Sequence, residues 1–393
     1  MVVTSFQTAA LPQLIFGAGR YTELPSLVKR YGRRVLLVTG KRSFDAAEAL
    51  LTAFEREGIE YDRVMISGEP SPADIDSAVH AYPLADVVVG IGGGAVIDAG
   101  KAISAMLPTQ QPVKRFLEGV GDLRPSGEKV PYVACPTTAG TGAEVTKNAV
   151  ITEVGPQGFK KSLRHDRYVP DAVLIDPILA RSCPADVTAA CGMDALTQLL
   201  EAFVSTQASV FTDTFARSGL ASAARSLRRA VSHPDDLNAR SDMAWAAYTS
   251  GVSLAHAGLG VVHGLASPIG GFYSIPHGVV CGTLLPSATA INVEWLAQHD
   301  PEGVAIAKHA EVAALFGCAS RDPVEASHAL VDVLAQLKRD LSIPDLSTWS
   351  VGAEPRILDK AGLKNNPAPL DRESIARLLV NAGALVGDRA EDR

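Results

Sequence analysis

Four polar side chains in the second half of the chain have residue types and spacing that suit a metal or substrate site. Asp194 and Gln198 stand four residues apart in the apolar run CGMDALTQLLEAF, so a helix places them on one face. His263 lies near the end of another apolar run, and His277 stands at an expected helix start. A metal site would favour Asp-x-x-x-His over Asp-x-x-x-Gln, and lone histidines in such runs are commonly hydrogen-bonded core residues. Both interpretations remain open at this point.

Two loops in the first half have the composition of a phosphate- or ribose-binding site. GIGGGAVIDAGKA joins an apolar run to an expected helix, and its glycines let the backbone and a helix N-terminus approach an anion. PTTAGTGAEVT supplies hydroxyl groups beside further glycines directly after another apolar run. Ligands bind at the carboxyl ends of strands in parallel sheets, which supports this interpretation. A tight turn or helix cap without a ligand is the alternative in both cases.

A third loop, VTGKRSF, stands where a dinucleotide-binding sheet faces the adenosine ribose. NAD enzymes typically place an acidic residue there to bind the 2′-hydroxyl. This chain instead has Gly40 and Lys41, followed by Arg42 and Ser43, which leave room, positive charge and a hydroxyl for a 2′-phosphate. The loop favours NADP over NAD, although an ordinary basic surface loop would have the same composition.

The expected secondary structure that must position these residues differs between the two halves of the chain. Continuous apolar runs alternate with helical patterns in the first half and predict a mostly parallel, doubly wound α/β sheet. The expected strands are 33–40, 61–67, 85–94, 131–138 and 172–177, the helices between them are 44–58, 73–83 and 95–107, and 148–164 is a β-hairpin around Gly-Pro-Gln-Gly. The expected helices of the second half are 184–205, 211–232, 239–266, 310–317, 326–341 and 372–386. We therefore expect an α/β domain over 1–181 and an all-α domain over 182–393.

Composition limits the kinds of binding partner and the cellular compartment that we expect for this protein. The chain has 393 residues and a formal net charge of −7, which argues against a nucleic-acid-binding surface. No apolar run approaches the ~20 residues of a membrane span, and no signal peptide is evident. The five cysteines form no CxxC pair, so neither a disulfide framework nor a cysteine zinc site is indicated, and their scatter suits the cytoplasm.

Taken together, long ordered motifs over nearly the whole chain resemble the iron-containing (group III) alcohol dehydrogenase family. They are LIFGAGRYTELPSLV, GIGGGAVIDAGKA, PTTAGTGAEVT, LIDPILARSCPADVTAACGMDALTQLLEAFVS and HGLASPIGGFYSIPHGVVCGTLLP. The resemblance implies a dehydroquinate synthase-like fold, with a Rossmann-like dinucleotide-binding domain, a helical domain and an active site in the cleft between them. It implies an NAD(P)-dependent alcohol dehydrogenase or aldehyde reductase that acts on a small alcohol or aldehyde, and a homodimer is usual in the family.

The resemblance also assigns cofactor contacts residue by residue. The pyrophosphate would lie on the Gly-rich turn, and a hairpin lysine would reach the ribose, with Lys160 the better match and Lys161 the alternative. The implied contacts are Gly93, Gly94, Ala95, Asp98, Thr137, Thr138, Thr141 and Lys160.

The family's metal site is altered in this sequence. Its members hold one divalent metal, Fe²⁺ or Zn²⁺, through one Asp and three His, and the matching positions are Asp194, Gln198, His263 and His277. A further family histidine near the substrate is Ser267 here. Two histidines and a carboxylate can still hold Fe²⁺, but an amide oxygen is a weaker donor than imidazole, so we expect weaker metal binding.

The implied mechanism passes hydride between nicotinamide and a carbon that bears oxygen. A metal would stabilise the alkoxide as a Lewis acid. In the competing metal-free site, Gln198 and a protonated His263 or His277 would bind the substrate oxygen directly. Ser267 or a cofactor ribose hydroxyl could pass the proton to solvent, and Glu201 is expected to be a structural hydrogen-bond acceptor.

Three other functions are compatible with the fold. A lyase of the dehydroquinate synthase type, or a maleylacetate-reductase-like enzyme, would need basic residues for an acidic substrate, and the two helical motifs contain none apart from histidine. A cofactor-binding protein with an impaired metal site is the third alternative, because two expected histidines are missing.

Overall fold

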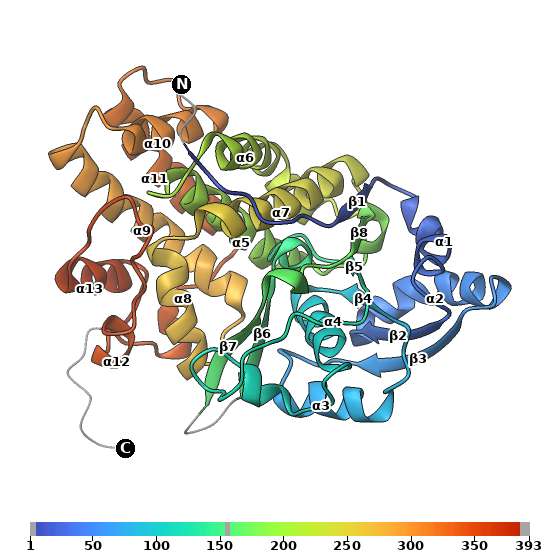
Figure 1. Ribbon diagram of the computed structural model, residues 1–393. Helices are drawn as coiled ribbons and strands as arrows, with labels where there is room; N and C mark the ends of the chain where they lie inside the picture. Colours follow the sequence, from blue (N-terminus) through green and yellow to red (C-terminus); the bar gives the residue numbers. More distant parts are fainter. Residues whose placement is uncertain (1–4, 154–157, 386–393) are drawn as a thin grey trace.

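A computed structural model describes residues 5–153 and 158–385 and shows a layered α/β half joined to a helical half (Figure 1). Six parallel strands form the main sheet in the order β1-β8-β5-β4-β2-β3. They are β1 (Gln13–Phe16), β2 (Arg34–Thr39), β3 (Glu60–Met65), β4 (Val87–Gly92), β5 (Tyr132–Pro136) and β8 (Ala172–Ile175). The helices of this half are α1 (Leu24–Val28), α2 (Lys41–Arg56), α3 (Pro72–Ala81) and α4 (Gly94–Met106). The predicted parallel α/β sheet is confirmed.

The short edge strand β1 was not predicted from the sequence. It has four residues and pairs only with β8, through Gln13–Ala172 to Phe16–Ile175. A run this short has no period of its own, so its pairing partner decides its conformation. The predicted hairpin is present as β6 (Asn148–Glu153) and β7 (Phe159–Arg164), while its predicted turn lies outside the described residues apart from Gly158.

The parallel register brings the three predicted loops to one edge of the sheet. Thr39 of β2 lies opposite Ile91 of β4, and Gly92 of β4 lies opposite Pro136 of β5. The strands therefore end side by side, at the carboxyl edge where open α/β sheets bind ligands. The loops that follow them begin at Gly40, Gly93 and Thr137.

The helical half contains α5 (Ala185–Val204), α6 (Val210–Ser232), α7 (Leu237–Ala257), α8 (Val261–Phe272), α9 (His277–His299), α10 (Val304–Leu315), α11 (Pro323–Asp340), α12 (Pro355–Leu358) and α13 (Arg372–Asn381). The strands end at Ile175 and α5 starts at Ala185, so the predicted boundary at 181/182 falls between them.

The single helix predicted over 239–266 is wrong. It is two helices, α7 and α8, that bend by 99° at the break. Gly258 ends α7 with a φ of +67°, a conformation that residues with a side chain rarely adopt. His263 consequently lies in the first turn of α8, not near the end of a long helix. The bend turns α8 towards the hairpin, where it lies beside β7 in Figure 1.

Two helices are more apolar than the sequence analysis allowed. By length and composition, α5 and α9 could each cross a membrane, and the bent pair α7–α8 would be a third such span. The expectation that no run approaches this length is therefore wrong. In their most apolar windows, 89% of α5 and 72% of α9 is buried inside the protein. Packing within the helical half accounts for this apolar character.

A buried cation ties the sheet to the hairpin. The Lys101 ammonium on α4 donates to the carbonyls of Ala143 and Asn148, both at 2.7 Å, and to Thr146 Oγ1 at 3.1 Å. Burial lowers the pKa of Lys101 to about 8 and raises the pKa of its neighbour Glu144 to about 7. These bonds fix the segment between the Thr-Gly loop and the start of β6.

Replacement of Glu144 by Gln should stabilise the protein in a pH-dependent way. The folded-state pKa of Glu144 lies above its ordinary value of 4.5, so its favourable contribution is complete below that pH and is lost as pH rises through about 7. Gln stays neutral throughout. We expect the gain in unfolding free energy for E144Q, measured in urea, to be larger at pH 8.5 than at pH 5, by on the order of 3 kcal/mol or less. An equal gain at both pH values would contradict the assignment.

Candidate metal and cofactor site

Four potential metal ligands from three helices meet at one point. They are Asp194 on α5, His263 on α8, and His277 and Cys281 on α9, and their ligand atoms all lie within 4.8 Å of one another. Asp194 Oδ1 lies 3.3 Å from His263 Nε2 and 3.8 Å from His277 Nε2. The Cys281 sulfur lies 3.7 Å from the Nε2 atom of each histidine.

These separations fit a single tetrahedral ion. With metal–ligand bonds of about 2.0–2.3 Å, tetrahedral geometry separates the ligand atoms by roughly 3.3–3.6 Å. Four of the six separations in the cluster run from 3.3 to 3.8 Å. All six separations lie within 4.8 Å, so the residues present suit a divalent metal after small adjustments of their side chains.

Glu201 orients one of the imidazoles from behind. It lies two turns after Asp194 on α5, and its Oε2 atom is 2.7 Å from His263 Nδ1. Its Oε1 atom accepts a hydrogen bond of 2.7 Å from the backbone N–H of Val262, at the N-terminus of α8. With Nδ1–H donated to this carboxylate, Nε2 carries the lone pair that faces the cluster. Glu201, which was predicted to be a structural hydrogen-bond acceptor, thus holds His263 in position.

The electrostatics of the cluster call for a positive charge. Burial opposes the charged form of Asp194, but His277 and His263 lower its pKa. Burial also opposes protonation of His263, but Cys281, Asp194 and Glu201 raise its pKa well above the usual value. Burial lowers the pKa of His277 to about 4 and raises that of Cys281 to about 12. Two buried carboxylates on either side of His263 are balanced by a proton on that ring or by a bound cation.

Gln198 lies in a different hydrogen-bond environment. Its side chain is 3% exposed, and its amide oxygen accepts a hydrogen bond of 2.7 Å from Ser250 Oγ on α7. That oxygen is the one amide atom able to ligate a metal. The predicted metal role of Gln198 remains untested, and its side chain serves the packing of α5 on α7.

The predicted cofactor loops line one cavity of ≈ 470 Å³. It opens at the carboxyl edge of the sheet, and the start of the helical half closes it. Its lining includes Gly40, Lys41, Ser43, Gly93, Thr137, Thr138, Ser182, Cys183, Pro184 and Val187. Five predicted cofactor contacts therefore face a common space, between the sheet and the first turn of α5.

The glycine run also has a structural reason. A Cβ atom on Gly94 would lie 2.8 Å from the Thr141 side chain, so a larger residue would push the Thr-Gly loop away from α4. Thr141 Oγ1 accepts a hydrogen bond from the backbone of Ala143 at 3.3 Å. The tight-turn interpretation and the ligand interpretation therefore hold together, because close packing of the two loops shapes the cavity. Ala95 follows Gly94 in the first turn of α4.

Asp98 and His277 share two charged neighbours, Lys160 and Glu69. Lys160 of β7 forms an ion pair with Glu69, and both charges act on Asp98 and on His277. Burial raises the pKa of Asp98 to about 6. Lys160 also lies 3.9 Å from the position that a Cβ atom on Gly270 of α8 would take. The hairpin thus approaches the metal cluster from the sheet side.

Ser267 lies one turn after His263 on α8, and its side chain is exposed. The helix repeat places both residues on one side of α8, so the predicted relay to solvent is geometrically possible and remains a prediction.

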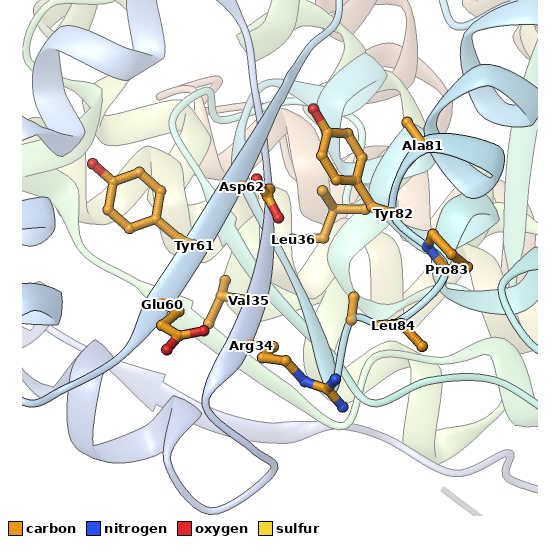
Figure 2. A pocket seen from close by; sticks show the side chains of 11 residues that line it. Arg34, Val35, Leu36, Glu60, Tyr61, Asp62, Ala81, Tyr82, Pro83 and Leu84 are labelled. Atoms are coloured by element: carbon orange, nitrogen blue, oxygen red, sulfur yellow. The ribbon is translucent and has the colours of Figure 1, made fainter.

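A second cavity, of ≈ 420 Å³, lies at the opposite edge of the sheet. Figure 2 shows its lining, with Arg34 from β2, Tyr61 and Asp62 from β3, and Tyr82 from the end of α3. Arg34 is the first residue of its strand and pairs with Asp86 at 2.7 Å. The amino ends of the strands form this cavity, so it is separate from the cofactor loops.

The sequence analysis missed Cys281 as a site residue. It also found no indication of a cysteine zinc site in the absence of CxxC, whereas Cys281 lies in a cluster that could hold a metal. The signal was present as His277-x-x-x-Cys281, a spacing that puts both side chains on one helix face. A search for cysteine pairs alone overlooks a cysteine whose partners are histidines.

Comparisons with known proteins agree along the whole chain. Residues 12–177 match the family model for iron-containing alcohol dehydrogenase, and residues 188–383 match the C-terminal model of the Fe-containing alcohol dehydrogenase family. The chain is 34% identical over 323 residues to 1,3-propanediol dehydrogenase of Klebsiella pneumoniae, with 80% of each protein covered. It is 33% identical over 387 residues to alcohol dehydrogenase 4 of Saccharomyces cerevisiae (strain ATCC 204508 / S288c), with 94% of this chain and 97% of the yeast protein covered.

A solved structure confirms the fold. The crystal structure of a 1,3-propanediol oxidoreductase superposes with a TM-score of 0.85 at 29% identity, over 96% of this chain and all of the other. Both halves match in order, and together they carry the cofactor loops and the four-residue cluster. The chain therefore belongs to the iron-containing alcohol dehydrogenase family and is an NAD(P)-dependent oxidoreductase that acts on CH–OH groups.

Proposed function

We propose that this enzyme interconverts a small alcohol and its aldehyde with NADP, at a metal held in the cluster of Asp194, His263 and His277. The observation that carries the proposal is the path of α5. Val187 in its first turn lines the cofactor cavity, and Asp194, seven residues further on, belongs to the cluster. At 1.5 Å per residue the two lie about 10 Å apart along one helix. A nicotinamide that extends from the cavity along α5 would reach the cluster.

When bound, the nicotinamide supplies or accepts hydride and the metal supplies a Lewis acid for the alkoxide oxygen. The residues of the chain would bind the metal, orient its ligands and move the alcohol proton. Glu201 fixes the His263 ring, and Asp194 Oδ1 lies within 3.8 Å of the Nε2 atoms of both histidines. The exposed Ser267 hydroxyl lies one turn from His263 and can pass the alcohol proton towards solvent. The bend at Gly258 brings α8, and with it both side chains, to the cleft.

The charges around the cleft favour a neutral substrate. Lys160, whose charge acts on His277, is already paired with Glu69. An acidic substrate such as maleylacetate would need a cation that is not already neutralised. Relatives named for 1,3-propanediol and methanol support a short, uncharged alcohol. The scattered cysteines support a cytoplasmic location within this proposal.

Removal of the metal should abolish turnover and leave cofactor binding intact. We expect exhaustive chelation to lower kcat/KM for an aldehyde by at least about 100-fold, since a Lewis acid contributes several kcal/mol to such a step. NADPH binding, followed by nucleotide fluorescence, should be unchanged because the Gly-rich turn and the Thr-Gly loop remain. Readdition of Zn²⁺ or Fe²⁺ should restore activity. Full turnover by metal-depleted protein would contradict the metal-assisted reaction.

Replacement of Glu201 by Gln should weaken metal binding more than it weakens the fold. Gln can still accept the hydrogen bond from Val262, but it gives His263 Nδ1–H no charged partner. We expect metal affinity, measured by competition with a chelator, to fall about 10–100-fold. Glu311→Gln, which alters a surface carboxylate paired with Arg217, is the matched control and should bind metal normally. Equal affinity in the two variants would refute the orienting role.

Replacement of Gly40 by Asp should shift cofactor preference towards NAD. A Cβ atom at Gly40 has room, since its nearest neighbour is Ser43 Oγ at 3.4 Å. The new carboxylate would bind a ribose 2′-hydroxyl and repel a 2′-phosphate. We expect the ratio of NADPH to NADH affinity, from fluorescence titration, to fall at least about tenfold. Lys41→Ala, the companion variant, should weaken NADPH alone, and a wild-type preference for NADH would overturn the NADP assignment.

A further inference from the structure

We propose that Cys281 is the fourth protein ligand of the metal, as a thiolate, and that it makes the centre a Zn²⁺ site with one Asp, two His and one Cys. The proposal rests on the proposed function in one respect, namely that the cluster holds a divalent metal. It assigns the place expected for Gln198 to a residue on a different helix.

The geometry of α9 carries the assignment. His277 and Cys281 are four residues apart, in the first and second turns of this helix, so both side chains lie on the face turned towards Asp194. The sulfur is equidistant from the two histidine Nε2 atoms, at 3.7 Å from each. A Zn–S bond of about 2.3 Å and a Zn–N bond of about 2.0 Å predict roughly 3.5 Å for this separation. Cys281 is fully buried, so its sulfur has no solvent-facing alternative position.

The hydrogen bonding of Gln198 supports Cys281 as the fourth ligand in its place. Its amide oxygen is already bonded to Ser250 at 2.7 Å, and ligation would compete with that bond. An amide oxygen is also a poorer donor than thiolate for a first-row metal. In this assignment α5 supplies one ligand, Asp194, and α9 supplies two, His277 and Cys281. Four protein ligands are thus retained, and the substrate oxygen would bind as a fifth, a coordination number that catalytic zinc can reach.

The exchange changes the charge and the metal preference of the centre. A site of one Asp and three His leaves a divalent ion with a net charge of one, whereas Asp, two His and a thiolate neutralise it. On binding, the Cys281 sulfur forms a bond to Zn²⁺ and releases its proton to solvent, with no change of oxidation state. Thiolate ligands favour Zn²⁺ over Fe²⁺, and a neutral centre is less costly to bury.

Cobalt substitution tests the ligand without reference to turnover. Metal-depleted protein should be loaded with one equivalent of Co²⁺, and its ultraviolet absorption should be recorded. We expect a thiolate-to-cobalt charge-transfer band in wild type, its loss in Cys281→Ala, and its retention in Cys318→Ser, whose thiol lies outside the cluster. X-ray absorption of the zinc form should show one sulfur at about 2.3 Å.

Affinity separates the two candidate ligands. Cys281→Ala should weaken Zn²⁺ binding at least about 100-fold, since loss of a ligand exceeds the effect of a supporting residue, whereas Gln198→Ala should weaken it less than about tenfold. NADPH binding verifies that each variant is folded. A wild-type cobalt spectrum without the band would overturn the thiolate ligand even if the enzyme is active. A band in a protein that turns over no aldehyde would instead refute the proposed function and leave the ligand assignment intact.

Discussion

The Glu201 carboxylate fixes the start of α8 against α5. It accepts a hydrogen bond from the backbone N–H of Val262, in the first turn of α8, and another from Nδ1 of the His263 ring. A single side chain of α5 therefore fixes both the start of α8 and its orientation about its own axis. Without it, the backbone N–H groups that follow the 99° bend would lack a charged acceptor. The direction of α8 in turn places Gly270 beside Lys160 of the hairpin, which closes the cleft towards the sheet.

This arrangement explains why the site needs a cation. Asp194 and Glu201 bring two carboxylates into a region of low solvent access, on opposite sides of one imidazole. In the absence of a metal, Cys281, Asp194 and Glu201 raise the pKa of His263, and a proton on that ring balances the two carboxylates. Metal binding would replace that proton, so the same charges that stabilise the protonated ring also favour the ion. The apolar packing of α5 and α9 strengthens this preference by excluding water.

Much of this architecture followed from local sequence patterns. The strands β2, β4 and β5 are largely apolar runs that are followed directly by Gly or Thr, and parallel pairing was enough to bring their loops together. The break at Gly258 was not predicted, because the apolar pattern continues through it and only the positive φ reveals the bend. Cys281 was missed because only its spacing to His277 lies within one sequence motif, whereas Asp194 and His263 come from α5 and α8 through contacts that the fold creates.

The altered ligand set shows how a site can move a ligand between helices and keep its geometry. The i, i+4 relation that joins Asp194 to Gln198 on α5 recurs between His277 and Cys281 on α9, so either helix can present a second donor to the same point. Once Cys281 occupies that point, position 198 is free to bond Ser250 and fasten α5 to α7. Under this proposal, Gln at position 198 does not weaken the metal site, because Cys281 on α9 supplies the fourth ligand.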